Sequence, residues 1–130
     1  MPNRAAWAEI NLGALAHNYR EIRSRIAKEA KLCAVVKADA YGHGAVAVAR
    51  VALDEGAEYL AVATLSEALE LRAAGFTTPL LILGLVEPES AREVVDGNIT
   101  QTVCRMDLVE ALSKEAVRQG KTVKVHLTIE

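Results

Sequence analysis

A single pattern repeats along this sequence: a short apolar run, a polar residue, an amphipathic helix, a glycine and then the next apolar run. The apolar runs are brief and almost continuously apolar, which is typical of strands buried on both faces of a parallel sheet. They lie at Leu32–Val36, Tyr59–Ala63, Leu80–Leu83, Thr100–Cys104 and Val123–Leu127. The chain is therefore predicted to form an α/β fold.

The segments between these runs carry start and stop signals for helices. Asn11 is predicted to cap a first helix whose apolar stripe contains Leu12, Leu15, Tyr19, Ile22 and Ile26. Further start signals are two pairs with capping-box spacing and a proline suited to a first turn, namely Thr64 with Glu67, Asp107 with Glu110, and Pro88. Helices are expected to end in left-handed glycines at Gly56, Gly75, Gly97 and Gly120.

Strands and helices that alternate without interruption predict parallel strands joined by right-handed crossovers. An open doubly wound sheet and a (β/α)8 barrel both satisfy this pattern, and periodicity does not choose between them. A barrel needs about 250 residues, whereas this sequence of 130 residues supplies only five strand-like runs. It also stops at residues 123–130 with no helix after the last run. We expect one domain, 1–130, that is a fragment of a larger fold.

Charge, terminal sequence and cysteine usage exclude several classes of function. The formal net charge is −2 and the charges are interspersed, so no basic surface for nucleic acid is predicted. The sequence shows neither a signal-peptide core nor an apolar stretch long enough to span a membrane. Cys33 and Cys104 lie in apolar runs and are predicted to be buried free thiols. No metal site is predicted, since two isolated cysteines lack the spacing of a zinc site.

The segment that carries chemistry is AVVKADAYGHG, residues 34–44. Lys37 follows the first strand, at the end that faces the ligand-binding mouth in parallel α/β folds. Its primary amine can form a Schiff base. Tyr41, Gly42 and Gly44 come just before the next helix, where backbone N–H groups favour an anion such as phosphate. Taken singly, each residue has a simpler interpretation: a solvated lysine, a packed tyrosine, or glycines that serve only a turn.

The uninterrupted string VVKADAYGHG resembles the cofactor-attachment signature of alanine racemases. Shorter likenesses to that family lie along the rest of the chain, at residues 6–10, 60–63, 67–68 and 79–84. The resemblance implies the N-terminal part of a (β/α)8 barrel domain. It implies a pyridoxal-phosphate-dependent isomerase that interconverts L- and D-alanine through a Lys37 aldimine, in the cytoplasm, and supplies D-alanine for peptidoglycan.

The same resemblance assigns roles to individual residues. Lys37 is implied to carry pyridoxal 5'-phosphate and to act as acid and base on one face of the substrate, and Tyr41 to bind the phosphate. Leu83 is implied to line the cofactor pocket. A tyrosine of the partner subunit of a homodimer would serve the second face, from sequence that follows this chain in the family. Thr128 and Glu130 stand where the family usually has lysine and aspartate, which alters the local charge network.

Two other functions stay open at this level. One is a pyridoxal-phosphate-binding barrel that does not racemise amino acids. The other is a non-catalytic domain or inactive fragment of a racemase that keeps the motif. The substrate is also left open, because relatives that handle serine share the lysine motif.

Overall fold

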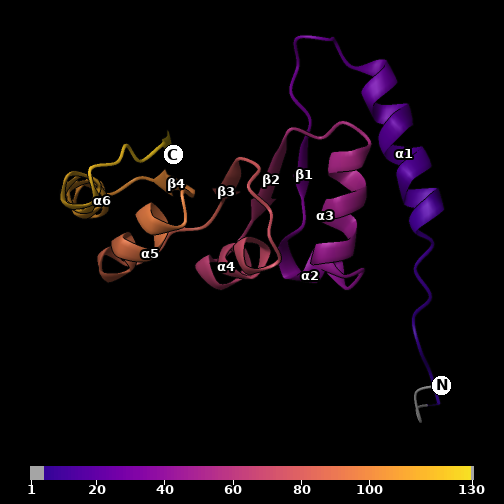
Figure 1. Ribbon diagram of the computed structural model, residues 1–130, viewed down its shortest axis with the longest axis horizontal. Helices are drawn as coiled ribbons and strands as arrows, with labels where there is room; N and C mark the ends of the chain where they lie inside the picture. The colour runs from indigo at the N-terminus through magenta and orange to yellow at the C-terminus, as the bar shows by residue number, and fades with distance from the viewer. Residues whose placement is uncertain (1–4, 130) are drawn as a thin grey trace.

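The computed structural model describes residues 5–129 as a single parallel sheet with helices packed against it (Figure 1). The five strands are β1 (Cys33–Val35), β2 (Tyr59–Val62), β3 (Leu80–Ile82), β4 (Thr100–Val103) and β5 (Val125–Leu127). Each falls inside an apolar run predicted from the sequence, and each is shorter than that run by one or two residues. Glu130, whose role was predicted from the family resemblance, lies outside the described residues.

The strand order distinguishes the two architectures that the sequence left open. The sheet runs β1-β2-β3-β4-β5, and every neighbouring pair is parallel. Each crossover therefore moves one strand further in the same direction, whereas a doubly wound sheet reverses direction at a switch point. Sequential order is the arrangement of a (β/α)8 barrel. The predicted fold class, the N-terminal portion of such a barrel, is confirmed.

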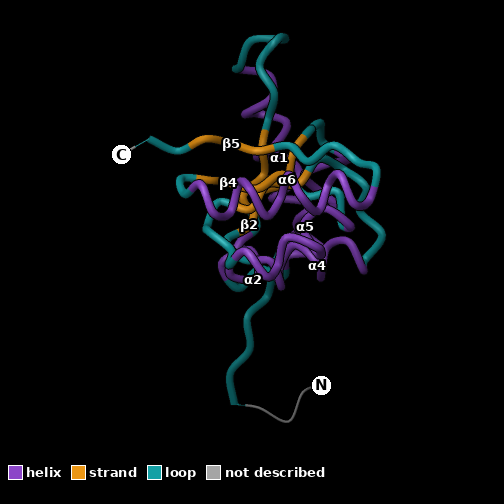
Figure 2. The backbone as a smooth tube through the Cα atoms, turned by 90° about the vertical axis from the view of Figure 1, so that its left-hand side faces the viewer, coloured by secondary structure: helices purple, strands orange, loops and turns teal. Residues whose placement is uncertain are grey.

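The helices follow the strands in the predicted alternation. They are α1 (Leu12–Arg25), α2 (Lys37–Tyr41), α3 (Ala45–Asp54), α4 (Leu65–Ala73), the short 3-10 helix η1 (Pro88–Ser90), α5 (Ala91–Asp96) and α6 (Met106–Gln119). In Figure 2 the strands gather in the centre and α2 and α4 lie below them. Within residues 5–129, no helix has both the length and the apolarity that crossing a membrane requires.

Three of the predicted helix starts are confirmed. The Asn11 side chain accepts a hydrogen bond from the Ala14 amide (2.9 Å) and so caps α1. Thr64 and Glu67 form a complete capping box at the start of α4. Pro88 is the first residue of η1, where its missing N–H costs nothing.

Two local predictions are wrong. Asp107 does not begin α6, because the helix starts one residue earlier, and the Asp107 carboxylate instead pairs with Arg105 and accepts from the Leu108 amide. Gly97 has φ −75°, and the left-handed position falls on Asn98 (φ 49°), two residues before β4 begins. Asparagine tolerates that region because its short polar side chain can hydrogen-bond locally. Gly56, Gly75 and Gly120 do adopt positive φ.

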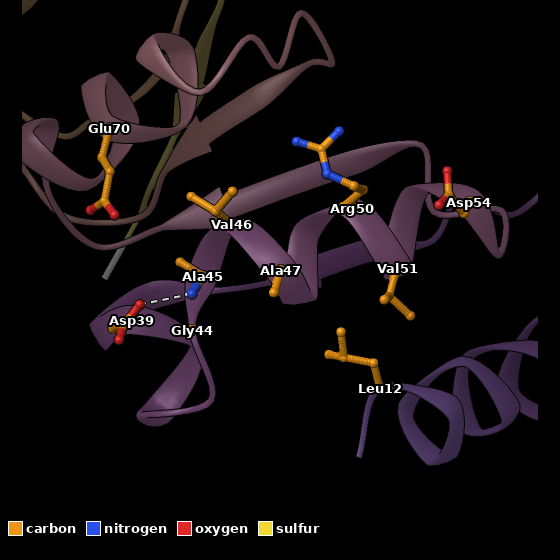
Figure 3. A pocket seen from close by; sticks show the side chains of 10 residues that line it. All are labelled: Leu12, Asp39, Gly44, Ala45, Val46, Ala47, Arg50, Val51, Asp54 and Glu70. Atoms are coloured by element: carbon orange, nitrogen blue, oxygen red, sulfur yellow. Dashed lines mark hydrogen bonds between the residues drawn. The ribbon is translucent and has the colours of Figure 1, made fainter. Parts of the chain in front are cut away.

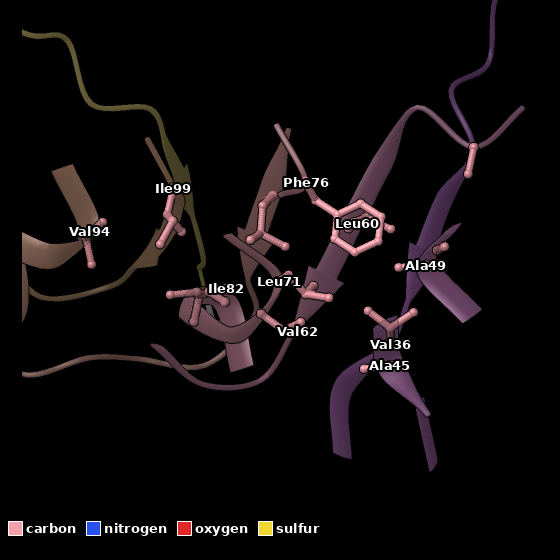
Figure 4. Packing of buried hydrophobic residues seen from close by; sticks show 14 of the residues in the cluster. Val36, Ala45, Ala49, Leu60, Val62, Leu71, Phe76, Ile82, Val94 and Ile99 are labelled. Carbon is pink, nitrogen blue, oxygen red and sulfur yellow. The ribbon is translucent and has the colours of Figure 1, made fainter. Parts of the chain in front are cut away.

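The hydrophobic core lies between the sheet and the helices. Alternate strand residues point toward the helices, which is the period expected of a pleated strand. Ala34 and Val36 of the β1 segment, Leu60 and Val62 of β2, and Leu80 and Ile82 of β3 are all buried there. Figure 4 shows Val36, Leu60, Val62 and Ile82 with the α3 and α4 side chains Ala49 and Leu71. The helices therefore fix the orientation of the strands on this face.

The opposite face of the sheet is less covered than the sequence predicts. Burial on both faces holds for β3 and β4, but Cys33 and Val35 of β1 are exposed and every residue of β5 is exposed. Val35 faces away from the helices, and no helix after β5 covers that strand within residues 5–129. The prediction that Cys33 and Cys104 are buried is wrong, although both are free: Cys33 is exposed on the uncovered face of β1, and Cys104 is exposed just past the end of β4.

A half-buried arginine joins the amino-terminal ends of β3 and β4. The Arg72 guanidinium donates to four backbone carbonyls, those of Gly97 (2.8 Å), Phe76 (2.9 Å), Thr78 (2.8 Å) and Asn98 (3.0 Å). These carbonyls belong to the turns that precede the two strands. One side chain thus ties α4 to the turn before β3 and to the turn after α5.

The exposed sheet face and the two edge strands lead to a prediction about residues 1–130 in isolation. Edge strands present unpaired backbone groups, and exposed apolar side chains such as Leu127 (70% exposed) and Ile129 (86%) promote association. We expect this polypeptide to self-associate. Sedimentation velocity measures this directly. A single monomeric species that also melts cooperatively would contradict the expectation.

Candidate active site

Lys37 leaves the sheet at the carboxyl end of β1. The ladder continues one residue past the strand, because the Val36 amide donates to the Ala61 carbonyl (2.8 Å), and Lys37 follows at once. Its side chain is half-buried, and its Nζ lies 5.9 Å from the centroid of the Tyr41 ring. This separation is within the range of a cation–π contact. The structure therefore brings together the two motif residues that were predicted to share a site.

The backbone between them forms an unexpected turn. Ala38, Asp39, Ala40 and Tyr41 have φ values of 50°, 53°, 54° and 56°, so α2 is a turn of left-handed helix. The Ala40 amide donates to the Val36 carbonyl (2.9 Å), and the Gly44 amide donates to the Asp39 carbonyl (2.9 Å). Left-handed helix costs L-residues about 1–2 kcal/mol each. Such strain persists only where surrounding contacts hold it, and it is concentrated at functional sites.

Two carboxylates hold this left-handed turn from opposite sides. Glu67 Oε1 accepts from the Ala38 amide (2.8 Å), while its Oε2 accepts from the Ala63 (2.7 Å) and Thr64 (3.2 Å) amides. Asp39 Oδ1 accepts from the Ala45 amide (2.8 Å), the bond drawn in Figure 3. The turn is thereby tied both to the end of β2 and to the start of α3.

The Asp39 side chain occupies the place where the sequence predicts a bound anion. The sequence predicts a phosphate at the N-terminus of the helix that follows the glycines, which the structure identifies as α3. The negative Asp39 side chain already lies on the first amide of α3. Tyr41 is 65% exposed, and an added Cβ at Gly42 or Gly44 would meet no atom within 4 Å. The exposed Tyr41 side chain can thus reach an anion from this turn.

Leu83 lies at the same edge of the sheet, two strands away. It follows β3, its amide donates to the Val62 carbonyl (2.8 Å), and its side chain is 42% exposed. Gly84 comes next and approaches β2 closely, since a Cβ there would lie 2.5 Å from the Ala63 carbonyl oxygen. The buried Gln101 side chain donates to the Gly84 carbonyl (2.8 Å) and fixes this loop. Lys37, Tyr41 and Leu83 therefore share the carboxyl edge of the sheet.

Sequence reasoning missed Glu67 and Gln101 as supports of this edge. The Thr64–Glu67 spacing predicts a helix cap, but nothing in the local pattern indicates that Glu67 also reaches Ala38, 29 residues earlier. Gln101 is a polar residue inside a predicted strand, and this was the signal available in the sequence. In the structure its side chain is fully buried. Thr128 was singled out, and here its amide continues the ladder to the Val103 carbonyl (2.9 Å).

The edge offers an amine and a phenol and lacks a metal-binding cluster. Among residues 5–129, no three His, Cys, Asp or Glu side chains gather to hold a metal ion. A groove of about 570 Å³ lies against α1, α3 and α4 (Figure 3). It contains neither Lys37 nor Tyr41. A lysine amine beside a tyrosine hydroxyl fits a cofactor that carries an aldehyde and a phosphate.

Comparison with known proteins identifies the family. The family model described as "Alanine racemase, N-terminal domain" matches residues 10–130. The chain belongs to this family. An alanine racemase of Desulforamulus reducens is 49% identical over 124 residues, which are 95% of this chain and 34% of that protein. An alanine racemase of Desulfovibrio desulfuricans is 48% identical over 128 residues, or 98% of this chain and 34% of that protein.

Solved structures of alanine racemases share the fold of this chain. An alanine racemase of Clostridium difficile 630 superimposes with a TM-score of 0.91 at 39% identity, covering 97% of this chain and 33% of that one. A histidine racemase of Leuconostoc mesenteroides gives a TM-score of 0.82 at 34% identity, covering 96% of this chain and 33% of that one. The chain thus spans about a third of the length of the alanine racemases it matches.

Because Ala38 is left-handed, its replacement by glycine should affect the free energy of unfolding differently from the same change in an ordinary helix. Glycine adopts positive φ without steric cost, so Ala38→Gly removes about 1–2 kcal/mol of strain and adds about 0.5–1 kcal/mol of entropic cost. We expect it to leave the free energy of unfolding unchanged or to raise it by up to about 1.5 kcal/mol.

Ala47→Gly is the matched control, because Ala47 is an exposed alanine in the right-handed helix α3. It should lower the free energy of unfolding by about 1 kcal/mol. Urea unfolding of both variants beside the unsubstituted protein measures the difference. Equal losses in the two variants would show that Ala38 is not left-handed.

Proposed function

We propose that this chain is the N-terminal part of a longer pyridoxal-phosphate-dependent amino-acid racemase in which Lys37 holds the cofactor. The observation that carries the proposal is the place of Lys37, at the carboxyl end of β1 and next to Tyr41 on a left-handed turn. Active sites of parallel barrels lie at this edge. The proposal is further supported by relatives named alanine racemase along nearly the whole of this chain.

The residues of this chain would divide the work between binding and proton transfer. Lys37 Nζ would bond to the aldehyde carbon of the cofactor with release of one water, and Tyr41 would donate a hydrogen bond to its phosphate. Leu83 would pack beside the ring. When bound, pyridoxal phosphate withdraws electrons from the α-carbon of the amino acid. As a free amine, Lys37 could hold and return a proton at Nζ.

Racemisation needs a second acid and base on the opposite face of the α-carbon. We propose that this group is a tyrosine of a partner subunit, so that the working enzyme is a homodimer in the cytoplasm. Alanine is the proposed substrate, and D-alanine for peptidoglycan the proposed product. The name "histidine racemase" of one structural neighbour supports the wider class of amino-acid racemases.

Chemical trapping tests the proposed role of Lys37. Borohydride reduction of the full-length protein in the presence of pyridoxal phosphate, followed by peptide mapping, should place the pyridoxyl group on Lys37. Lys37→Arg should abolish racemisation even when the protein folds, because a guanidinium neither bonds to the aldehyde nor gives up its proton. A label found only on another lysine would contradict the proposal. Cofactor binding without racemisation would instead favour a non-catalytic binding protein.

Tyr41 should govern retention of the cofactor more than the chemical step. A hydrogen bond to a charged group contributes about 1.5–3 kcal/mol. Tyr41→Phe should therefore weaken pyridoxal phosphate binding by about ten- to a hundredfold, while a measurable rate of racemisation remains at saturating cofactor. Equilibrium dialysis compares the two proteins. Unchanged retention in the phenylalanine variant would show that the hydroxyl does not contact the phosphate.

A further inference from the structure

The Glu67 carboxylate links the junction between β2 and α4 to the turn after β1, 29 residues earlier in the sequence. It projects from the first turn of α4, accepts from the Ala63 and Thr64 amides at the end of β2, and accepts from the Ala38 amide after β1. A capping box requires only the bond to the N-cap amide, here that of Thr64. The contact with Ala38 is additional, and helix capping does not explain it.

The bond to Ala38 acts on Lys37 directly. The Ala38 amide nitrogen and the Lys37 carbonyl belong to one rigid peptide plane. A carboxylate that holds this N–H therefore fixes the orientation of the plane that joins Lys37 to the left-handed turn. The next residues depend on that orientation, because the Ala40 amide must reach back to the Val36 carbonyl (2.9 Å) to close the turn.

The surroundings of Glu67 keep its carboxyl group ionised. Burial raises the pKa of this carboxyl group, but the three backbone N–H donors and the nearby Lys37 ammonium lower it, and the net shift of the pKa is downward. Glu67 is thus ionised at neutral pH and accepts on both oxygens. Hydrogen bonds to an ionised acceptor are roughly twice as strong as those between neutral groups. This strength offsets part of the strain in the turn.

We propose that Glu67 is a positioning residue for Lys37: it clamps the Lys37–Ala38 peptide plane and so holds the lysine amine at the carboxyl edge of the sheet. The inference rests on the proposed function, because it takes Lys37 as the residue that bonds to pyridoxal phosphate. Glu67 itself need not touch the cofactor. Its effect is to preorganise the amine so that little rearrangement precedes the reaction.

Glu67→Gln tests the clamp with the smallest change of shape. A glutamine has one acceptor oxygen, so in either orientation its NH₂ group meets a backbone N–H that the carboxylate accepted. The readouts are the rate at which Lys37 of the full-length protein becomes borohydride-trappable with pyridoxal phosphate, and the visible circular dichroism of the bound cofactor. We expect trapping to slow about tenfold or more and the dichroism to diminish, at temperatures where the variant is folded.

Two controls separate positioning from stability. Thr64→Ala removes the other half of the capping box and costs helix stability of about 1 kcal/mol, but leaves the Ala38 contact in place. Glu70→Gln removes the same charge from an exposed position of α4. Both should trap pyridoxal phosphate on Lys37 at the parent rate. If Glu67→Gln does not fold, Glu67→Asp decides, because it keeps the charge but is too short to span Ala63 and Ala38.

The outcomes distinguish this inference from the proposed function. If Lys37 of the parent protein is not labelled at all, the proposed function fails. If the parent is labelled and the folded Glu67 variant is labelled at the same rate with the same dichroism, only the positioning role is overturned. Equal slowing in Thr64→Ala and Glu67→Gln would likewise overturn it, since loss of the cap alone would then explain the effect.

Discussion

Four consecutive L-residues follow Lys37 in the left-handed region, and this segment costs about 1–2 kcal/mol at each residue. A right-handed turn would be easier to form but would send the chain from β1 in another direction. The left-handed turn is retained because carboxylates receive its amides: Glu67 holds Ala38, and Asp39 reaches forward to Ala45. The local strain is thus balanced by hydrogen bonds that also join β1 to α3 and to the β2–α4 junction.

The two ends of the sheet carry different kinds of polar contact. At the amino-terminal ends of β3 and β4, Arg72 binds four backbone carbonyls and no motif residue is present. At the carboxyl ends of β1, β2 and β3 lie Lys37, the first turn of α4 with Glu67, and Leu83. This division agrees with the general organisation of parallel barrels, in which one end stabilises the fold and the other carries chemistry. Arg72 can therefore be understood from folding alone, whereas the left-handed turn cannot.

The sequence predicted the strands, most helix starts and the edge at which Lys37 lies, because these follow from short-range periodicity and capping. The failures have different causes. Asp107 pairs with its neighbour Arg105 in place of capping α6, Cys33 lies on the uncovered face of β1, and Cys104 lies past the end of β4. The left-handed turn was also beyond prediction, since Ala38 and Ala40 have no intrinsic preference for positive φ. Only the distant Glu67 and the local Asp39 make that conformation stable.

The central claim is that a left-handed turn clamped by Glu67 presents Lys37 to an aldehyde cofactor. A crystal structure of the full-length protein with pyridoxal phosphate, at a resolution that shows carbonyl orientations, tests it most directly. The account predicts continuous density from Lys37 Nζ to the cofactor, positive φ from Ala38 to Tyr41, and the Glu67 carboxylate on the Ala38 amide. A right-handed turn after β1, or a cofactor joined to another lysine, would contradict it.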